Sequence, residues 1–255
     1  MRKILFLIVA LSILQYASNS YGFSNKGENC SKCHTLKKEE AATLLKQLDP
    51  NIKVLGIKLT PLKSLWEIDV ESGSKKAILY LDITKKYLIE GQILDIKGKK
   101  NLTQESGEVL NKIDASKIPL GDANVMGDKN AKKRVIVFTD PDCPFCAKLH
   151  SELKKIIAER KDVVFFIKMF PLPIHKEAAG KAKAIVCEKS LALLDAAFEK
   201  KPISKPKCKT SAVDDNIALG KKLGITGTPT LVMPDGRVIS GFRDANALKA
   251  SIDKK

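Results

Sequence analysis

The pattern of apolar and polar positions changes along the chain, and each pattern predicts a different structure. Residues 4–14 form an almost unbroken apolar run behind a short basic head. Residues 39–48 repeat apolar side chains at helical spacing, and residues 52–96 change to the alternation of half-buried strands. Residues 135–138 are a compact apolar run, which is typical of a buried parallel strand. The pattern indicates a leader followed by two structural parts.

The part that begins at this last run predicts an α/β order. A helix over 143–159 and a second buried strand over 163–170 come next. The remaining patterns predict helices over 176–200, 213–223 and 245–252, and strands over 230–233 and 237–240. Before the first strand, residues 105–113 predict a short connecting helix and residues 121–130 a loop. Strand, helix, strand, helical insertion, hairpin and helix is an α/β succession.

The leader has the three-part pattern of a secretory signal peptide. Its basic head and apolar run are followed by small and polar residues up to Gly22. The apolar run is shorter than the ~20 residues that span a bilayer comfortably. We expect residues 1–22 to be cleaved and the mature protein to be soluble outside the cytoplasm, with an uncleaved anchor as the alternative.

Composition and charge narrow the possible functions. The chain is 44% hydrophobic and 29% charged, which allows a sizeable core. Its formal net charge is +16, but the lysines are scattered and aromatic residues are only 5%. Nucleic-acid recognition needs a clustered basic face, so we expect a solvated, lysine-rich surface and no nucleic-acid partner. Six cysteines, all beyond the leader, favour disulfide chemistry in an exported chain.

The strongest chemical motif is Cys143-Pro144-Phe145-Cys146, which opens a predicted helix directly after a buried strand. Unpaired N–H groups at a helix start favour negative charge, so Cys143 is expected to be a nucleophilic thiolate. Two intervening residues place Cys146 one turn away, where it can resolve a mixed disulfide. A zinc site would need a second cysteine pair in the same domain, and a static disulfide would not need this placement. The motif therefore predicts a catalytic dithiol.

Thr228-Pro229 precedes a predicted strand about 80 residues after the dithiol. A proline at this place can be cis, which would fix a tight backbone opposite the dithiol and expose a peptide edge. We interpret Thr228 and Pro229 as a loop that binds the client and guards the thiol.

Cys187 and Cys208 are 21 residues apart and flank a loop rich in lysine and proline. Such a pair predicts a stapling disulfide, which typically contributes about 2–4 kcal/mol of stability. Two buried free thiols are the alternative.

These motifs resemble those of a known family. Residues 138–150 together with Gly227-Thr228-Pro229 are similar to the bacterial periplasmic disulfide isomerases of the DsbC/DsbG family. The resemblance extends over nearly the whole mature chain, because residues 77–96 resemble the family's N-terminal dimerisation domain. It implies an α/β chain: a thioredoxin-like fold with a helical insertion, preceded by a small α+β (cystatin-like) dimerisation domain.

The resemblance also implies domain boundaries and partners. Behind an extension over 23–36 come the dimerisation domain over 37–100, a linker helix over 101–120 and the catalytic domain over 121–255. The family has a structural disulfide where Cys187 and Cys208 fall. The implied assembly is a V-shaped periplasmic homodimer whose cleft holds misfolded clients and which a DsbD-type membrane donor reduces. A second copy would also help a domain of about 65 residues, which buries little of its own surface.

The functional alternatives stay open at this point. Pro144-Phe145 differs from the Gly-Tyr pair of the isomerase and is nearer to the Pro-Tyr pair of DsbG. Disulfide isomerase is the leading hypothesis, and no cofactor is required for it. A disulfide oxidase or reductase and a DsbG-like holdase chaperone are the alternatives.

The extension carries a separate motif, Cys30-Ser31-Lys32-Cys33-His34. It satisfies the Cys-x-x-Cys-His pattern of covalent haem c, with His34 as the potential iron ligand. A plain disulfide, a second redox dithiol or a metal site are the other interpretations. His150, on the helical face of Cys143, is interpreted as a packed residue or a tuner of the thiol, and His175 is assigned no role.

Overall fold

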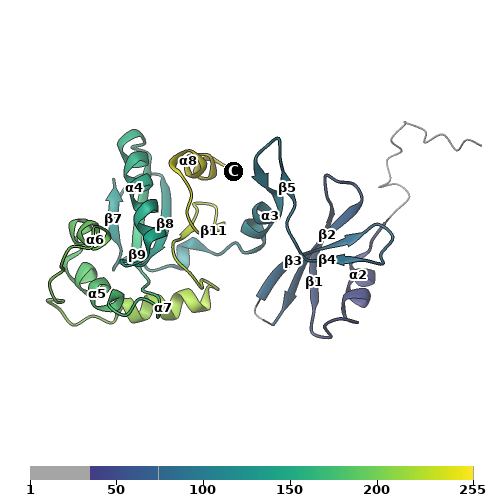
Figure 1. Ribbon diagram of the computed structural model, residues 1–255, viewed down its shortest axis with the longest axis horizontal. Helices are drawn as coiled ribbons and strands as arrows, with labels where there is room; N and C mark the ends of the chain where they lie inside the picture. Colours follow the sequence, from purple (N-terminus) through teal and green to yellow (C-terminus); the bar gives the residue numbers. More distant parts are fainter. Residues whose placement is uncertain (1–34, 74, 255) are drawn as a thin grey trace, which may run out of the picture.

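The computed structural model describes residues 35–73 and 75–254, which form two sheet-based bodies joined through a short helix (Figure 1). The predicted signal peptide and the motif of Cys30, Cys33 and His34 lie outside the described residues. Within the described ranges, no helix has both the length and the apolar content needed to cross a bilayer.

The N-terminal body is an antiparallel sheet covered by helix α2 (Lys38–Leu45). The sheet order is β1-β2-β3-β4, formed by Lys53–Leu59, Leu65–Ser72, Lys75–Asp82 and Leu88–Ile89. Ala41 and Leu45 of the helix pack on Ile68 and Val70 of the central strand. This face is the small apolar core that the alternation predicted.

Strand β2 departs from the expected alternation at Glu67. The pattern placed this carboxylate in solvent, but it is buried and lies 2.9 Å from Lys58 Nζ. The reason is that helix α3 (Leu102–Leu110) lies over this second face, where Ser106 Oγ accepts a hydrogen bond from Lys58. Local alternation alone cannot show that a polar residue is buried when the element that covers it comes later in the sequence.

Two short segments connect the bodies. A small hairpin of β5 (Leu94–Asp95) and β6 (Lys100–Asn101) leads into α3, whose first turn is capped by the Asn101 side chain. This cap starts the helix at Leu102, earlier than the predicted 105. A single turn of 3-10 helix, η2 (Ala115–Lys117), precedes the second body.

The second body contains a five-stranded mixed sheet in the order β11-β10-β8-β9-β7. The strands are β7 (Asn124–Gly127), β8 (Lys133–Thr139), β9 (Val163–Met169), β10 (Thr230–Val232) and β11 (Val238–Ser240). The central strands β8 and β9 are parallel, and the other pairs are antiparallel. The predicted loop over 121–130 was wrong, because it contains β7, a short edge strand with Asn and Gly at its ends.

Five helices surround this sheet: α4 (Pro144–Glu159), α5 (Ala178–Glu188), α6 (Leu191–Phe198), α7 (Ala212–Lys222) and α8 (Ala245–Asp253). The helical region predicted over 176–200 is divided into two helices, α5 and α6. Lys189 has left-handed backbone, with φ at 46°, and Ser190 caps α6 by accepting from the Leu193 N–H.

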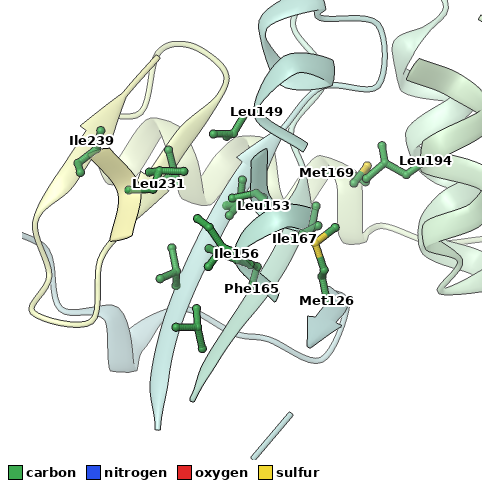
Figure 2. Packing of buried hydrophobic residues seen from close by; sticks show 14 of the residues in the cluster. Met126, Leu149, Leu153, Ile156, Phe165, Ile167, Met169, Leu194, Leu231 and Ile239 are labelled. Atoms are coloured by element: carbon green, nitrogen blue, oxygen red, sulfur yellow. The ribbon is translucent and has the colours of Figure 1, made fainter. Parts of the chain in front are cut away.

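The apolar core holds α4 against the sheet and so determines where this helix begins. Leu149, Leu153 and Ile156 follow each other at helical spacing and pack on Phe165 and Ile167 of β9 (Figure 2). All five side chains are essentially inaccessible to solvent. Their burial orients the helix so that it begins next to the C-terminal end of β8.

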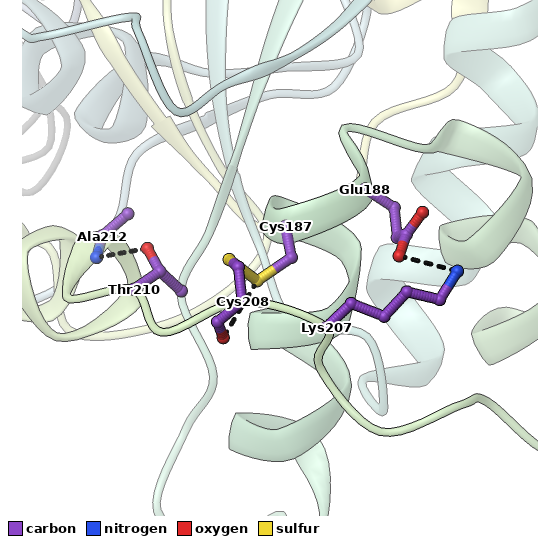
Figure 3. The surroundings of a disulfide bond; sticks show 6 residues. All are labelled: Cys187, Glu188, Lys207, Cys208, Thr210 and Ala212. Atoms are coloured by element: carbon purple, nitrogen blue, oxygen red, sulfur yellow. Dashed lines mark hydrogen bonds and ion pairs between the residues drawn. A yellow bond between two sulfur atoms is a disulfide. The ribbon is translucent and has the colours of Figure 1, made fainter.

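A disulfide bond joins Cys187, at the end of α5, to Cys208 in the segment before α7 (Figure 3). An ion pair at 3.1 Å between Lys207 and Glu188 lies beside it. The bridge therefore ties an otherwise irregular part of the helical insertion to a packed helix.

Candidate active site

Cys143 is the N-cap residue of α4, and Pro144 is the first residue with helical backbone. The Cys143 N–H donates to the Asp140 carbonyl at 3.1 Å, which folds the chain sharply between β8 and the helix. Proline fits this first turn because its missing N–H has no partner there. The N–H groups that follow are left free to face an anion at the Cys143 sulfur.

The two sulfurs have opposite acidities. A hydrogen bond from the Cys146 side chain, aided by the backbone N–H groups of Cys146 and Phe145, lowers the pKa of Cys143 to about 6. Burial raises the pKa of Cys146, whose side chain is only 1% exposed. At neutral pH Cys143 is therefore mostly thiolate, and Cys146 stays protonated and can donate to it.

The loop of Thr228 and Pro229 lies against Cys143. The Thr228-Pro229 peptide bond is cis, and the Thr228 carbonyl lies 3.6 Å from Cys143 Sγ. Thr230 Oγ1 donates to Gly227 O, and the Gly241 N–H donates to Pro229 O, so both sides of the loop are held. Among the described residues, Thr228 Oγ1 is buried without a hydrogen-bond partner.

A groove of about 530 Å³ lies beside Cys143. Its lining combines apolar and cationic side chains, among them Cys143, Pro144, Ala147, His175, Lys181 and Phe198. The structure thus brings together four of the predicted site residues: Cys143, Cys146, Thr228 and Pro229. The bridge of Cys187 and Cys208 does not line this groove.

Two residues of the site were missed by the sequence analysis. Asp140 is fully buried, and its carboxylate accepts hydrogen bonds from the N–H groups of Asp142 (2.8 Å) and Leu172 (2.7 Å). His175 Nδ1 donates to the same carboxylate at 2.7 Å, and this bond raises the pKa of His175. A histidine in a proline-rich loop has no periodic pattern, so nothing in the sequence marked it.

His150 does not take part in the dithiol. Its Nε2 lies 2.8 Å from Asp195 Oδ1, its ring packs on Phe198, and burial lowers the pKa of His150. In the part of the chain that is described, no group of three or more His, Cys, Asp or Glu side chains forms a metal-binding cluster.

Two family models match the chain and together cover almost all of the described residues. Residues 122–255 match the thioredoxin-like domain, and residues 34–104 match the N-terminal domain of disulfide bond isomerase proteins. Both halves of the fold-class prediction are therefore confirmed.

Curated relatives are similar over most of the chain. A probable thiol:disulfide interchange protein DsbC of Bordetella avium is 28% identical over 75% of this chain and 66% of its own length. The DsbC proteins of Dickeya dadantii and Escherichia coli are 28% and 26% identical, over 77% and 80% of this chain and 79% and 83% of their own lengths.

Solved structures resemble about half of the chain. A disulfide interchange protein from Neisseria gonorrhoeae is 34% identical, with a TM-score of 0.47, over 53% of this chain and 96% of its own. The family models and the relatives carry the assignment. The chain belongs to the DsbC family of thiol:disulfide interchange proteins, with a thioredoxin-like domain that makes it a thiol:disulfide oxidoreductase.

Proposed function

We propose that this protein rearranges incorrect disulfides in exported proteins, with Cys143 as nucleophile and Cys146 as resolving thiol. One observation carries the proposal: Cys143, whose pKa is lowered to about 6, lines a groove at the start of α4, and Cys146, one turn further along the helix, is buried with a raised pKa. In such a pair, Cys143 can attack a client disulfide while Cys146 stays a thiol, so the two cysteines do not first form a disulfide with each other.

The exchange follows from the geometry. The Cys143 thiolate attacks one sulfur of a client disulfide, so that a mixed disulfide forms and the other client sulfur leaves as a thiolate. A second client thiolate can then attack the mixed disulfide, which forms a new client disulfide and returns Cys143 as a thiolate. Alternatively, Cys146 loses its proton and attacks Cys143 Sγ, which releases a reduced client and leaves the pair oxidised. The high pKa of Cys146 slows this second outcome and favours isomerisation.

The cis loop and the groove supply the client site. The Thr228 carbonyl beside Cys143 is a backbone edge that an extended client segment can pair with. Apolar side chains of Pro144 and Phe198 in the groove offer contacts to residues next to the client cysteine.

The assembly we propose is a periplasmic homodimer that a DsbD-type membrane donor keeps reduced. Its N-terminal body matches the isomerase N-terminal domain, and among the described residues β4 is an edge strand of the sheet. Tyr87 and Ile89 on this edge are exposed, at 68% and 43%. A second copy would pair with the edge and cover these apolar side chains.

The test is reactivation of a scrambled, disulfide-rich substrate by the mature protein under reducing conditions. We expect Cys143→Ala to abolish reactivation, because no other described thiol is free and ionised at neutral pH. Ser151→Ala, on an exposed turn of the same helix, should keep full activity and serves as the matched control. Reactivation that survives Cys143→Ala would contradict the proposal.

Pro144-Phe145 between the cysteines favours an oxidase or reductase as the second candidate. Equilibration with glutathione measures the reduction potential, and a value near that of strong oxidants, about −120 mV, would assign the protein as an oxidase. A holdase role would instead appear as suppression of client aggregation that persists without both catalytic cysteines.

The front motif of Cys30, Cys33 and His34 stays a prediction. If it binds haem c, protein produced together with a haem-attachment system will show a Soret band and the added haem mass. A colourless product of apo mass leaves the dithiol or disulfide interpretation.

A further inference from the structure

Two carboxylates lie directly before the nucleophile, where they oppose its ionisation. Asp140 is fully buried and Asp142 is adjacent to Cys143 in the chain. A negative charge near a thiol disfavours the thiolate and raises its pKa. The pKa of Cys143 is nevertheless lowered, chiefly by the hydrogen bond from Cys146, and the structure also pairs each of the two carboxylates with a cation.

The two cations come from the segment that leads into α5 and from the first turn of this helix. His175 Nδ1 lies 2.7 Å from Asp140 Oδ2, and Lys181 Nζ lies 2.6 Å from Asp142 Oδ1. Both cationic side chains line the same groove as Cys143. Each carboxylate before the nucleophile is thus paired with one cation.

We propose that His175 is a positioning residue for exchange: as an imidazolium bonded to Asp140, it neutralises the buried carboxylate and thereby keeps Cys143 ionised. The inference rests on the proposed function and assigns a role that the dithiol motif does not contain.

The charge of Asp140 acts on the dithiol because this residue is close to it: the Asp140 backbone contacts both cysteines. Its carbonyl accepts from the Cys143 N–H at 3.1 Å, and its N–H points to Cys146 Sγ at 3.5 Å. The N–H groups of Asp142 and Leu172 hold its carboxylate in place. The imidazole is therefore needed for its charge more than for the position of the carboxylate.

The charges around His175 determine the pH range in which its imidazole is cationic. Asp140, the Cys143 thiolate and Asp142 all raise the pKa of His175. The groove is also lined by the charged side chains of Lys176, Glu177, Lys181 and Lys200, and Lys181 Nζ lies 3.5 Å from Glu177. His175 is cationic below its raised pKa, and Cys143 is ionised above about 6. The pair of charges coexists in the window between these two values.

The experiment compares His175→Asn with wild type and with Lys148→Gln. The asparagine Nδ2 can replace the histidine Nδ1 as donor to Asp140 but carries no charge. Lys148→Gln removes a charge from an exposed position on α4 and controls for the general loss of positive charge. Ionisation of Cys143 is followed by the ultraviolet absorbance of the thiolate and by the rate of alkylation against pH.

We expect His175→Asn to raise the pKa of Cys143 by about half a unit, which lowers alkylation about threefold at pH values below the pKa. Lys148→Gln should match wild type, and His175→Lys, which restores a cation, should recover part of the loss. An unchanged profile in His175→Asn, or an equal shift in Lys148→Gln, would overturn the inference.

The wild-type profile separates this inference from the proposed function. If wild-type Cys143 is protonated at neutral pH and inert to alkylation, the proposed function fails. If wild type reacts as a thiolate and His175→Asn reacts identically, only the role of His175 fails.

Discussion

At the scale of single residues, the proposed exchange assigns attack and resolution to two chemically identical side chains, Cys143 and Cys146. Cys143 and Cys146 differ in position by one helical turn, yet one meets unpaired backbone N–H groups and the other meets the core. The first environment favours the anion and the second favours the neutral thiol. Both sulfurs are nearly inaccessible, so the groups that face each one, more than its exposure, support the proposed order of attack and resolution.

The division predicts how the alkylation of Cys143 depends on pH. Alkylation of the reduced wild type should rise with pH through a midpoint of about 6, because only the thiolate reacts. In Cys146→Ala the midpoint should move upward, since the hydrogen bond from Cys146 is the largest cause of the lowered pKa. The same variant should accumulate mixed disulfides with client. A midpoint unchanged by Cys146→Ala would contradict this account and would leave the helix N-terminus and the neighbouring charges as the groups that set the pKa.

Much of this site could be predicted from the sequence, and the rest could not for a definable reason. The motif of Cys143 and Cys146 is local, so spacing and the preceding strand were enough to place it. The bond between Asp140 and His175 joins positions 35 residues apart through a loop without periodicity. Only the fold brings these two residues together.

At the scale of helices and strands, boundaries depended on side chains that cap or cover them. Ser190 and Asn101 cap α6 and α3 with their side chains, and each moved a boundary away from the apolar pattern. Both residues are recognisable capping types, so closer attention to them would have found the starts of these helices. The short strand β7 could not be found this way, because pairing with β9 defines it.

The bridge between Cys187 and Cys208 allows a test of stability at this scale. The double substitution to alanine should lower the free energy of unfolding by about 3 kcal/mol, as the chain-entropy argument gives for a loop of this length. Urea unfolding of the oxidised proteins measures the loss. The pKa of Cys143 should not change, because the bridge does not line the groove. A large shift in that pKa would show that the insertion shapes the active site.

Two helical glycines form a second, matched test. A methyl group at Gly220 in α7 would overlap the Phe170 ring, whereas the same group at Gly180 in α5 would meet no atom within 4 Å. Gly220→Ala should therefore destabilise the protein by about 1–3 kcal/mol through overpacking. Gly180→Ala should stabilise it by up to about 1 kcal/mol through helix propensity. Equal effects in thermal or urea unfolding would contradict this account of the packing.

At the scale of the whole molecule, the two bodies are connected through polar contacts on α3 and on the segment that follows it. Lys254 Nζ, at the end of the second body, lies 3.1 Å from Glu105 on this helix. The buried Arg237 side chain lies 3.7 Å from Glu108, and the Ile113 N–H donates to Gly236 O at 2.9 Å. None of these contacts could be predicted from local pattern, because each one joins residues separated by more than 100 positions.

The proposed dimer is tested at this scale. Ile89→Asp places a charge on the exposed edge of β4, where a second copy would have to bury it. We expect this variant to sediment as a monomer and wild type as a dimer. Leu48→Asp, at a position beyond the end of α2 that is also exposed, should remain dimeric. A monomeric wild type, or a dimeric Ile89→Asp, would contradict the proposed interface.

The placement of one sulfur above another also bears on survival in an oxidising compartment. A peroxide that reaches the groove meets Cys143 first and converts it to a sulfenic acid. Cys146, shielded but within reach, can then displace water and form the ordinary disulfide of the pair. Peroxide damage is thus converted into a disulfide that the proposed reductant would also reduce, before the irreversible sulfinic acid can form.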